Sequence, residues 1–275
     1  MGFRISSNIG ALSAARYLSK AQRQTEESLR SIASGSRVDN PANDAAGFAI
    51  SEQLKSQTAG LKQAKFNGEA AISFIQTAEG TLNEQNNILI RLRELGVIAA
   101  SDTVGDLERD YLNNEFQQLV SEFDRIAKTA RFGGKQLLTG DGTEFEFHVG
   151  ENNGPENVIK FKLDANTQAD QVGIQDLSVG DQDAAGESLE NIDEAINKVV
   201  GTRASFGAAQ SRFQYAIDNL SSQVQNIEAA RSTIADVDLA EEVSNLTRSQ
   251  IMTDIATSVL AQANASNSRV LKLIG

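Results

Sequence analysis

A regular spacing of apolar residues over residues 189–234 is the feature of this chain that most constrains its fold. Spacings of three and four residues, taken in turn from Leu189, select fourteen positions. Eleven of these are apolar, and the exceptions are Arg203, Gln210 and Arg231. An average period of about 3.5 residues is typical of a long helix packed against another helix as in a coiled coil. The positions of this seam are Leu189, Ile192, Ile196, Val199, Arg203, Phe206, Gln210, Phe213, Ile217, Leu220, Val224, Ile227, Arg231 and Ile234.

A second seam of the same kind lies in the first half of the chain. It follows the same rhythm between Ile50 and Ala99, with more Ala and Gly than the first seam. Two long helices from opposite halves of the chain therefore need packing partners. The second seam comprises Ile50, Leu54, Gln57, Leu61, Ala64, Gly68, Ala71, Ile75, Ala78, Leu82, Gln85, Leu89, Leu92, Gly96 and Ala99.

Composition and charge exclude several classes of function. The 275 residues carry 25 basic and 37 acidic side chains, a net charge of −12, so nucleic acid is not expected as a partner. The absence of Cys excludes disulfides, thiolate metal sites and a cysteine nucleophile. No run approaches the roughly 20 apolar residues that cross a bilayer, so we expect no membrane insertion. Residues 1–20 lack the apolar core of a secretory signal, and we expect export to leave the N-terminus intact.

The two ends of the chain are amphipathic and oppositely charged. Residues 1–40 hold six basic and three acidic side chains, whereas residues 236–275 hold three basic and five acidic ones. A helix with one apolar stripe buries it against a partner, and we expect each terminus to be that partner for the other. The predicted terminal seam comprises Ile5, Ile9, Leu12, Leu239, Val243, Leu246, Ile255, Val259, Leu271 and Ile274.

A third helix and a β-hairpin are predicted between the long seams. Apolar residues over 112–126 again alternate four and three, and Thr103 with Asp106 predicts a capping box before them. Apolar and charged residues then alternate over 144–149 and 159–163, around a turn at residues 153–154. Period two on both sides of a turn predicts a hairpin with acidic residues on one strand opposite basic residues on the other.

The predicted fold class is therefore mainly α. Long antiparallel coiled-coil-like helices carry a small β-hairpin tip, and the N- and C-termini pair as an inner helical domain.

Single residues give no sign of catalysis, a metal site or a cofactor. His148 is the one histidine, and we interpret it as a solvated residue because no other ligands cluster near it in sequence. The glycines before Lys135 lack the spacing of a phosphate-binding loop and predict a turn. Glu241 and Glu242 are adjacent, so they do not face each other on a helix as an acid/base pair would.

Four separated strings resemble bacterial flagellin, the filament subunit of the flagellum. They are SGSRVDNPANDAAGFAIS at 34–51, ARFGGKQLLTG at 130–140, FGAAQSRFQYAIDNL at 206–220 and DVDLAEEVSNLTRSQIMTDIATSVLAQANASNSRVLKLIG at 236–275. They occur in the family's order and cover both terminal regions and both flanks of the middle. The chain departs from the family at Asn43, where Asp is usual, and at Phe206, where Leu is usual.

The resemblance implies a structural protein and not an enzyme. It implies a self-assembling subunit of the extracellular helical flagellar filament, which serves swimming motility and leaves the cell by type III export. The implied domains are an inner coiled-coil domain (1–43 plus 236–275) and a rod-like helical domain (44–235) with its β tip at about 141–180. The middle is short, which implies a minimal form without the variable outer domains. The alternatives are a hook–filament junction protein, a minor flagellin of the same export system, or an enzyme inserted in a flagellin frame, for which the short middle leaves no room.

The resemblance also implies partners. They are further copies of the chain, the flagellar export chaperone, the cap and hook-junction proteins, and a host toll-like receptor for flagellin. Arg91, Leu95 and Glu115 occupy places that match the receptor-recognised stretch of the family. These three residues either form a receptor-binding surface or serve only contacts between neighbouring subunits, and both interpretations stay open.

The terminal regions are expected to be disordered in the free subunit. A single amphipathic helix pair buries little apolar area, which at about 25 cal/mol per Å² does not offset ~1–2 kcal/mol of backbone ordering per residue. Neighbouring subunits would cover the remaining apolar stripe, so that ordering would be coupled to assembly.

Overall fold

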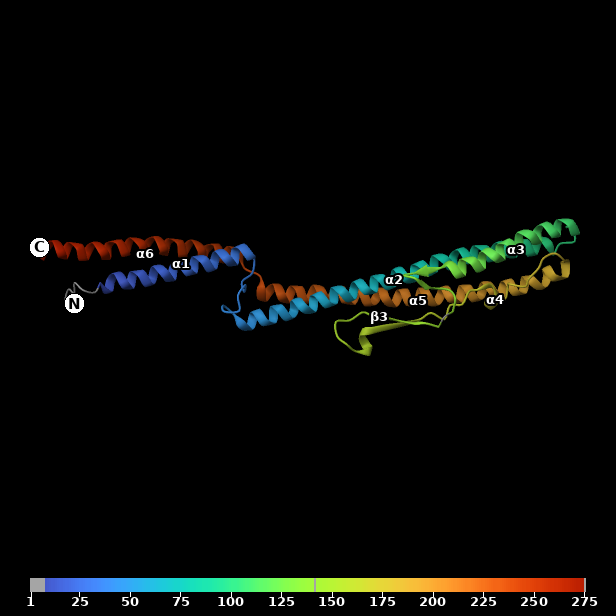
Figure 1. Cartoon of the computed structure of the whole chain (residues 1–275), viewed down its shortest axis with the longest axis horizontal. Coiled ribbons are helices and arrows are strands. Elements are labelled where there is room, and N and C mark those ends of the chain that lie inside the picture. Colours follow the sequence, from blue (N-terminus) through green and yellow to red (C-terminus); the bar gives the residue numbers. More distant parts are fainter. Residues whose placement is uncertain (1–7, 141, 275) are drawn as a thin grey trace. The chain divides into compact units, whose positions relative to one another are not determined.

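Helices make up most of the described part of this chain, and two short β-ribbons interrupt them there (Figure 1). The computed structural model describes residues 8–140 and 142–274, with side chains described to residue 266. The predicted mainly α fold with a small antiparallel hairpin is confirmed. The elements are α1 (Ile9–Ser34), α2 (Ala45–Ala99), α3 (Asp106–Thr129), β1 (Arg131–Phe132), β2 (Lys135–Gln136), β3 (Glu144–His148), a 3₁₀ turn (Pro155–Asn157), β4 (Val158–Lys162), α4 (Ala169–Val172), α5 (Gln182–Ala235) and α6 (Leu239–Ile274).

Contacts divide these elements into two compact units. The terminal unit combines the chain up to Thr58 with the chain from Gln225, and so holds α1, α6 and the adjoining ends of α2 and α5. The central unit runs from Ala59 to Val224 and holds the rest of the long helices, α3, α4 and both ribbons. The division predicted from sequence lies instead at the turns between helices, and it stays a prediction about which parts fold independently.

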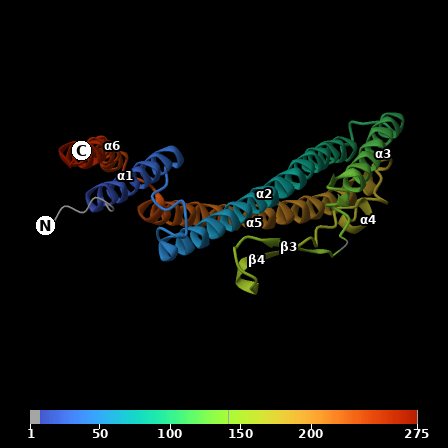
Figure 2. The same ribbon diagram turned by 60° about the vertical axis from the view of Figure 1, so that its left-hand side comes forward.

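In the central unit, α2 and α5 run side by side in opposite directions along the two predicted seams (Figures 1 and 2). A Cβ atom added at Gly68 would lie 3.0 Å from Cγ1 of Ile217, and one added at Gly96 would lie 3.0 Å from Cδ2 of Leu189. Both contacts join one predicted seam to the other, so the heptad register continues between them. The buried seam residues of this unit include Leu61, Ala64, Ala71, Ile75, Ala78, Leu82, Leu89, Leu92, Ile192, Val199, Phe206, Phe213, Ile217 and Leu220.

The seams are less well covered where they enter the terminal unit. Ile50 is 48% exposed, so its assignment to a buried seam is wrong for this chain alone. Val224, Ile227 and Ile234 are only partly buried. An apolar stripe is buried only where a partner packs on it. In this part of the seam the other helices of the chain cover the stripe only in part.

Helix α3 begins with a cap that differs from the predicted one. The carboxylate of Glu108 accepts a hydrogen bond from the backbone N–H of Gly105 at 2.7 Å, directly before the first helical residue. The hydroxyl of Thr103 lies 2.8 Å from the hydroxyl of Ser101 instead. The predicted capping box of Thr103 with Asp106 is therefore wrong, because the helix starts later than the box requires.

Buried polar side chains connect α2 to the segments packed on it. Gln85, a polar exception in the predicted seam, is 0% exposed, and its amide donates to the carbonyl oxygens of Phe123 and Thr167 at 3.3 Å each. The hydroxyl of Thr167 donates to Oε1 of Gln85 at 2.8 Å. Arg109 of α3 donates through Nε to the carbonyl oxygen of Ala99, near the end of α2, at 2.9 Å. These bonds satisfy polar groups that would be costly to bury without partners.

The predicted hairpin is formed by β3 and β4. Glu144 pairs with Lys162 and Glu146 pairs with Lys160, so acidic and basic side chains oppose each other as expected. The Nζ atom of Lys160 lies 2.7 Å from the Glu146 carboxylate, and this hydrogen bond raises the pKa of the lysine. Before the hairpin, β1 and β2 form a second ribbon whose turn uses the positive φ angles of Gly133 and Gly134, 57° and 84°.

Aromatic rings attach the β3–β4 hairpin to the long helices. Phe74 of α2 lies with its ring centroid 4.8 Å from that of Phe145 and 5.9 Å from that of Phe147. Phe147 also contacts Phe213 of α5 at 5.3 Å, edge to face. Such ring pairs contribute about 0.5–1.5 kcal/mol each beyond area burial. The hairpin is thus fixed against both α2 and α5.

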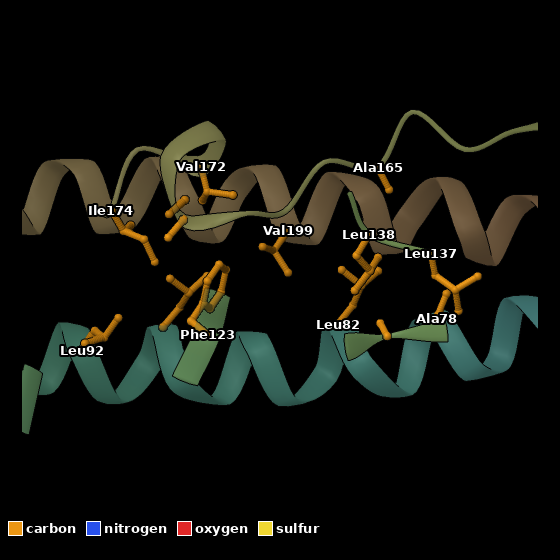
Figure 3. Close-up of a cluster of buried hydrophobic side chains, with 14 of the residues drawn as sticks. Ala78, Leu82, Leu92, Phe123, Leu137, Leu138, Ala165, Val172, Ile174 and Val199 are labelled. Carbon is orange, nitrogen blue, oxygen red and sulfur yellow. The ribbon is translucent and has the colours of Figure 1, made fainter. Parts of the chain in front are cut away.

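The core of the central unit draws on helices and irregular segments alike. Figure 3 shows side chains of α2, α3 and α5 meeting side chains from the connections around β2 and α4. The irregular connections therefore supply core residues that no helical periodicity marks. The labelled core residues are Ala78, Leu82, Leu92, Phe123, Leu137, Leu138, Ala165, Val172, Ile174 and Val199.

Candidate functional site

Small residues make the contact between the terminal helices α1 and α6. Ala14, Ala21 and Ser28 are buried on α1 at heptad spacing, and Ser249 and Ala256 are buried on α6 at the same spacing. Small side chains let two helix backbones approach closely, but they bury little apolar area. At the N-terminus of α1, Nδ2 of Asn8 donates to the carbonyl oxygen of Ala263 on α6 at 3.0 Å, while Oδ1 of Asn8 caps α1 by accepting from the backbone N–H of Ala11.

Most large apolar residues of the predicted terminal seam remain exposed. We expected each terminus to bury this stripe on the other, and that expectation is wrong because the small residues occupy the contact instead. Leu246 is partly buried, whereas Ile5, Leu271 and Ile274 lie outside the residues whose side chains are described. We call the exposed seam residues the terminal apolar set: Ile9 at 63%, Leu12 at 59%, Leu239 at 56%, Val243 at 49%, Ile255 at 50% and Val259 at 51%.

A groove of about 430 Å³ runs between α1 and α6. Tyr17 and Ala21 line it from α1, and Met252, Ile255 and Val259 line it from α6, with Lys20 and Gln24 also on the α1 side. Tyr17 is 68% exposed and Met252 is 50% exposed. The α1–α6 groove is thus largely apolar, with polar side chains along one wall.

The turn after α1 is bonded to the turn before α6. Gly35 ends α1 with a left-handed φ of 70°, and its carbonyl oxygen accepts from the backbone N–H of Val237 at 3.1 Å. The backbone N–H of Arg37 donates to Ala235 O at 2.7 Å, and its Nη2 donates to Ile234 O at 2.7 Å. These bonds hold together the two points where the chain enters and leaves the terminal helices.

Arg91 and Glu115 meet on the surface of the central unit. Nη2 of Arg91 on α2 lies 2.8 Å from Oε1 of Glu115 on α3, and Nη1 lies 3.0 Å from Glu94. The hydrogen bonds that Arg91 donates to Glu115 and, to a smaller extent, to Glu94 raise the pKa of Arg91. The side chains of Arg91 and Glu115 are 46% and 45% exposed, so the pair is open to a partner.

Leu95 does not share this surface. It is 0% exposed and belongs to the core of the central unit. A fully buried side chain does not contact a partner, so its predicted role as a contact residue is wrong. Sequence reasoning also missed the ion pair of Arg93, whose Nε lies 2.7 Å from Oδ1 of Asp193 on α5. Ile90 and Val97 are exposed on the same helix, 45% and 50%. The arginine at position 93 was visible in the sequence, but its partner a hundred residues away was not.

No cluster of metal-ligating side chains is found among the described residues. In residues 8–140 and 142–266, no three His, Asp or Glu side chains are grouped to hold a metal ion. His148 is exposed, as predicted, and its backbone oxygen accepts a hydrogen bond from Asn67 at 3.0 Å. Of the helices described, none is long and apolar enough to cross a membrane.

Comparison with known proteins identifies the family. Residues 5–143 match the bacterial flagellin N-terminal helical region, and residues 189–274 match the bacterial flagellin C-terminal helical region. The chain is 36% identical to a flagellin of Halalkalibacterium halodurans, covering 98% of this chain and 99% of that protein. It is 35% identical to the flagellar filament 33 kDa core protein of Treponema phagedenis, with the same coverage. The crystal structure of Bacillus cereus flagellin, 27% identical, covers 60% of this chain and 94% of that one with a TM-score of 0.51. The chain belongs to the bacterial flagellin family.

Proposed function

We propose that this chain is the structural subunit of a helical flagellar filament and assembles with further copies of itself. Its relatives carry the names flagellin and flagellar filament core protein, and the family is one of structural proteins. The observation that carries the proposal is the terminal apolar set, because large apolar side chains that stay about half exposed along paired helices gain stability when a neighbour covers them. The hook–filament junction alternative is not favoured by these relatives.

Assembly and ordering of the termini are coupled in this proposal. The buried residues of the α1–α6 contact are Ala and Ser, so the pair alone removes little apolar surface from water. At about 25 cal/mol per Å², small side chains contribute too little to offset ~1–2 kcal/mol of backbone ordering per residue. The helices α1 and α6 then become stably ordered only when neighbouring subunits cover the terminal apolar set.

Terminal regions that order only on assembly also bear on how the subunit is exported and on which proteins protect it. A chain whose ends are unfolded before assembly can pass through the flagellar type III channel to the extracellular filament. Exposed apolar ends would also aggregate unless another protein covers them. The export chaperone is the partner proposed for the cytoplasmic stage, and the cap and hook-junction proteins are those proposed at the two ends of the filament.

The Arg91–Glu115 surface is proposed as a contact between neighbouring subunits and as the site that a host toll-like receptor recognises. Its support is the exposed ion pair together with the exposed Ile90 and Val97 on the same helix. Arginine is enriched at protein interfaces, and the buried centre of an interface carries few charged residues, so an arginine beside exposed apolar side chains suits such a contact. The receptor half of this proposal rests on the family resemblance.

The decisive experiment adds purified full-length subunit to short filament seeds and follows their extension by electron microscopy. Helical filaments that lengthen with added subunit are expected. A chain lacking residues 236–275 is the control and should not extend the seeds. Failure of the full-length chain to extend seeds at any concentration, while it remains folded, would reject the filament proposal and favour a junction role.

A further inference from the structure

Met252 lies at the α1–α6 groove and carries the only sulfur atom among the described residues. The chain has no cysteine and two methionines, Met1 and Met252. Met252 is 50% exposed and lines the groove beside Tyr17, Ala21 and Ile255. Its thioether is therefore open to small solutes in the free subunit and lies in the part of the chain proposed to contact neighbours.

We propose that Met252 is a peroxide-sensitive modification site that controls assembly. The inference rests on the proposed filament function. In the reaction, a lone pair of the thioether sulfur attacks one oxygen of hydrogen peroxide, the O–O bond breaks and an S–O bond forms. A proton transfer releases the second oxygen as water, so the thioether is oxidised to the sulfoxide and the peroxide is reduced.

The sulfoxide changes what the groove can bind. A thioether is apolar and flexible and fills irregular apolar gaps, whereas a sulfoxide is a polar hydrogen-bond acceptor. In the free subunit the sulfoxide oxygen is hydrated, because the side chain is half exposed even when α1 and α6 are paired. Covering the groove with a neighbouring subunit removes that water, and an unpaired polar atom opposes the contact. Oxidation should therefore weaken assembly while leaving the fold of the central unit unchanged.

The groove and its surroundings explain why this methionine and not another side chain acts as the sensor. Tyr17 and Ile255, its apolar neighbours, have no sulfur, and the adjoining polar hollow is lined by Gln24, Ser28 and Arg248. Met252 lines both the apolar groove and the polar hollow. An oxygen atom added to its sulfur would therefore make the apolar groove more polar where it meets the hollow.

The test uses full-length wild type and Met252→Leu, each treated with hydrogen peroxide, freed of it with catalase and added to filament seeds. Peptide mass spectrometry confirms oxygen at Met252. We expect oxidised wild type to need about tenfold more subunit for seed extension, since one unsatisfied buried acceptor weakens each contact. Seed extension by Met252→Leu should be unaffected by peroxide, although this variant keeps Met1. Methionine sulfoxide reductase should restore seed extension by the oxidised wild type.

The outcomes separate this inference from the filament proposal. If untreated wild type does not extend seeds, the filament proposal fails. If untreated wild type extends them and verified oxidation of Met252 leaves the required concentration unchanged, the inference is overturned and the filament proposal stands. If Met252→Leu assembles poorly before treatment, the test relies on wild type treated with peroxide and then with the reductase. Recovery of seed extension would support the inference. Failure to recover would mean that other oxidative damage caused the loss, and the inference would be overturned.

Discussion

Gly68 lies against Ile217, and the absence of a side chain at position 68 is what lets α5 approach α2 there. A Cβ atom added to Gly68 would lie 3.0 Å from Cγ1 and 3.4 Å from Cδ1 of Ile217. The matching contact of Gly96 with Leu189 occurs a whole number of heptads away on both helices. Two glycine contacts in the same antiparallel register show that the small residues of the α2 seam fit the large residues of the α5 seam.

The first prediction concerns this close approach. Gly68→Leu should lower the free energy of unfolding by roughly 1–3 kcal/mol, because a large side chain at a full contact forces the helices apart. Gly80→Ala is the control, since apart from the adjoining residues and the backbone of its own helix no atom lies within 4 Å of a Cβ there. The control should raise stability by up to about 1 kcal/mol through helix propensity. Urea unfolding of both variants measures the difference, and a neutral Gly68→Leu would mean that the contact is not tight.

The second prediction concerns the centre of the seam. Ile217→Asp should destabilise the central unit by roughly 3 kcal/mol or more, because it buries an unpaired carboxylate at a position that is 6% exposed. Tyr215→Asp introduces the same charge two residues away at a side chain that is 77% exposed, and should change stability by about 0.5 kcal/mol or less. Thermal unfolding distinguishes the two. Equal melting of both variants would show that the assigned register is wrong.

The third prediction concerns the exposed pair of Arg91 and Glu115. Arg91→Ala should change the stability of the free subunit by no more than about 0.5 kcal/mol, because exposed ion pairs contribute little. Filament yield and receptor signalling by the free subunit should both fall if this one surface serves both proposed partners. Arg125→Ala is the matched control, because Arg125 forms a similar exposed pair with Glu122 at 2.6 Å on α3.

Assembled filaments extend the same test. They should signal poorly even with Arg91 intact, because in the proposed assembly a neighbouring subunit would occupy the surface. Equal signalling by free subunit and by stable filaments cleared of free subunit would contradict the shared surface. Loss of folding in Arg91→Ala would instead make the residue structural.

The fourth prediction concerns the terminal helices. Removing residues 236–275 should abolish assembly while the central unit keeps its cooperative unfolding transition, because its core from Ala71 to Phe213 uses no residue beyond Val224. Circular dichroism on heating measures the transition. Filaments formed by the shortened chain would refute the division into a polymerising end and a self-sufficient middle.

Hydrogen exchange on the full-length chain checks the proposed coupling between ordering and assembly. Amides of α1 and α6 should exchange quickly in the free subunit and slowly in filaments, whereas those around Leu82 and Leu92 should be protected in both. Stable protection of the terminal helices in the free subunit would count against the coupling.

The sequence by itself determined the elements of this fold. Heptad spacing located α2, α3 and α5, and period-two alternation located the β3–β4 hairpin with its opposed charges. These features depend on local geometry, because helical and extended backbones repeat their faces every 3.6 and 2 residues, respectively. The family was indicated separately, by the resemblance of four sequence strings and not by these periodic patterns.

Only the tertiary structure decided which apolar residues are covered. Periodicity assigned Leu92 and Ile255 to apolar stripes alike, but Leu92 is 0% exposed in the core and Ile255 is 50% exposed beside a groove. The seven-residue spacing of Ala14 and Ala21 marks the α1–α6 contact, yet nothing local says that small residues, and not the neighbouring large ones, will make it. A repeat defines a face of a helix, whereas its burial depends on the shape of a partner far away in the chain, and that information exists only once the helices are packed.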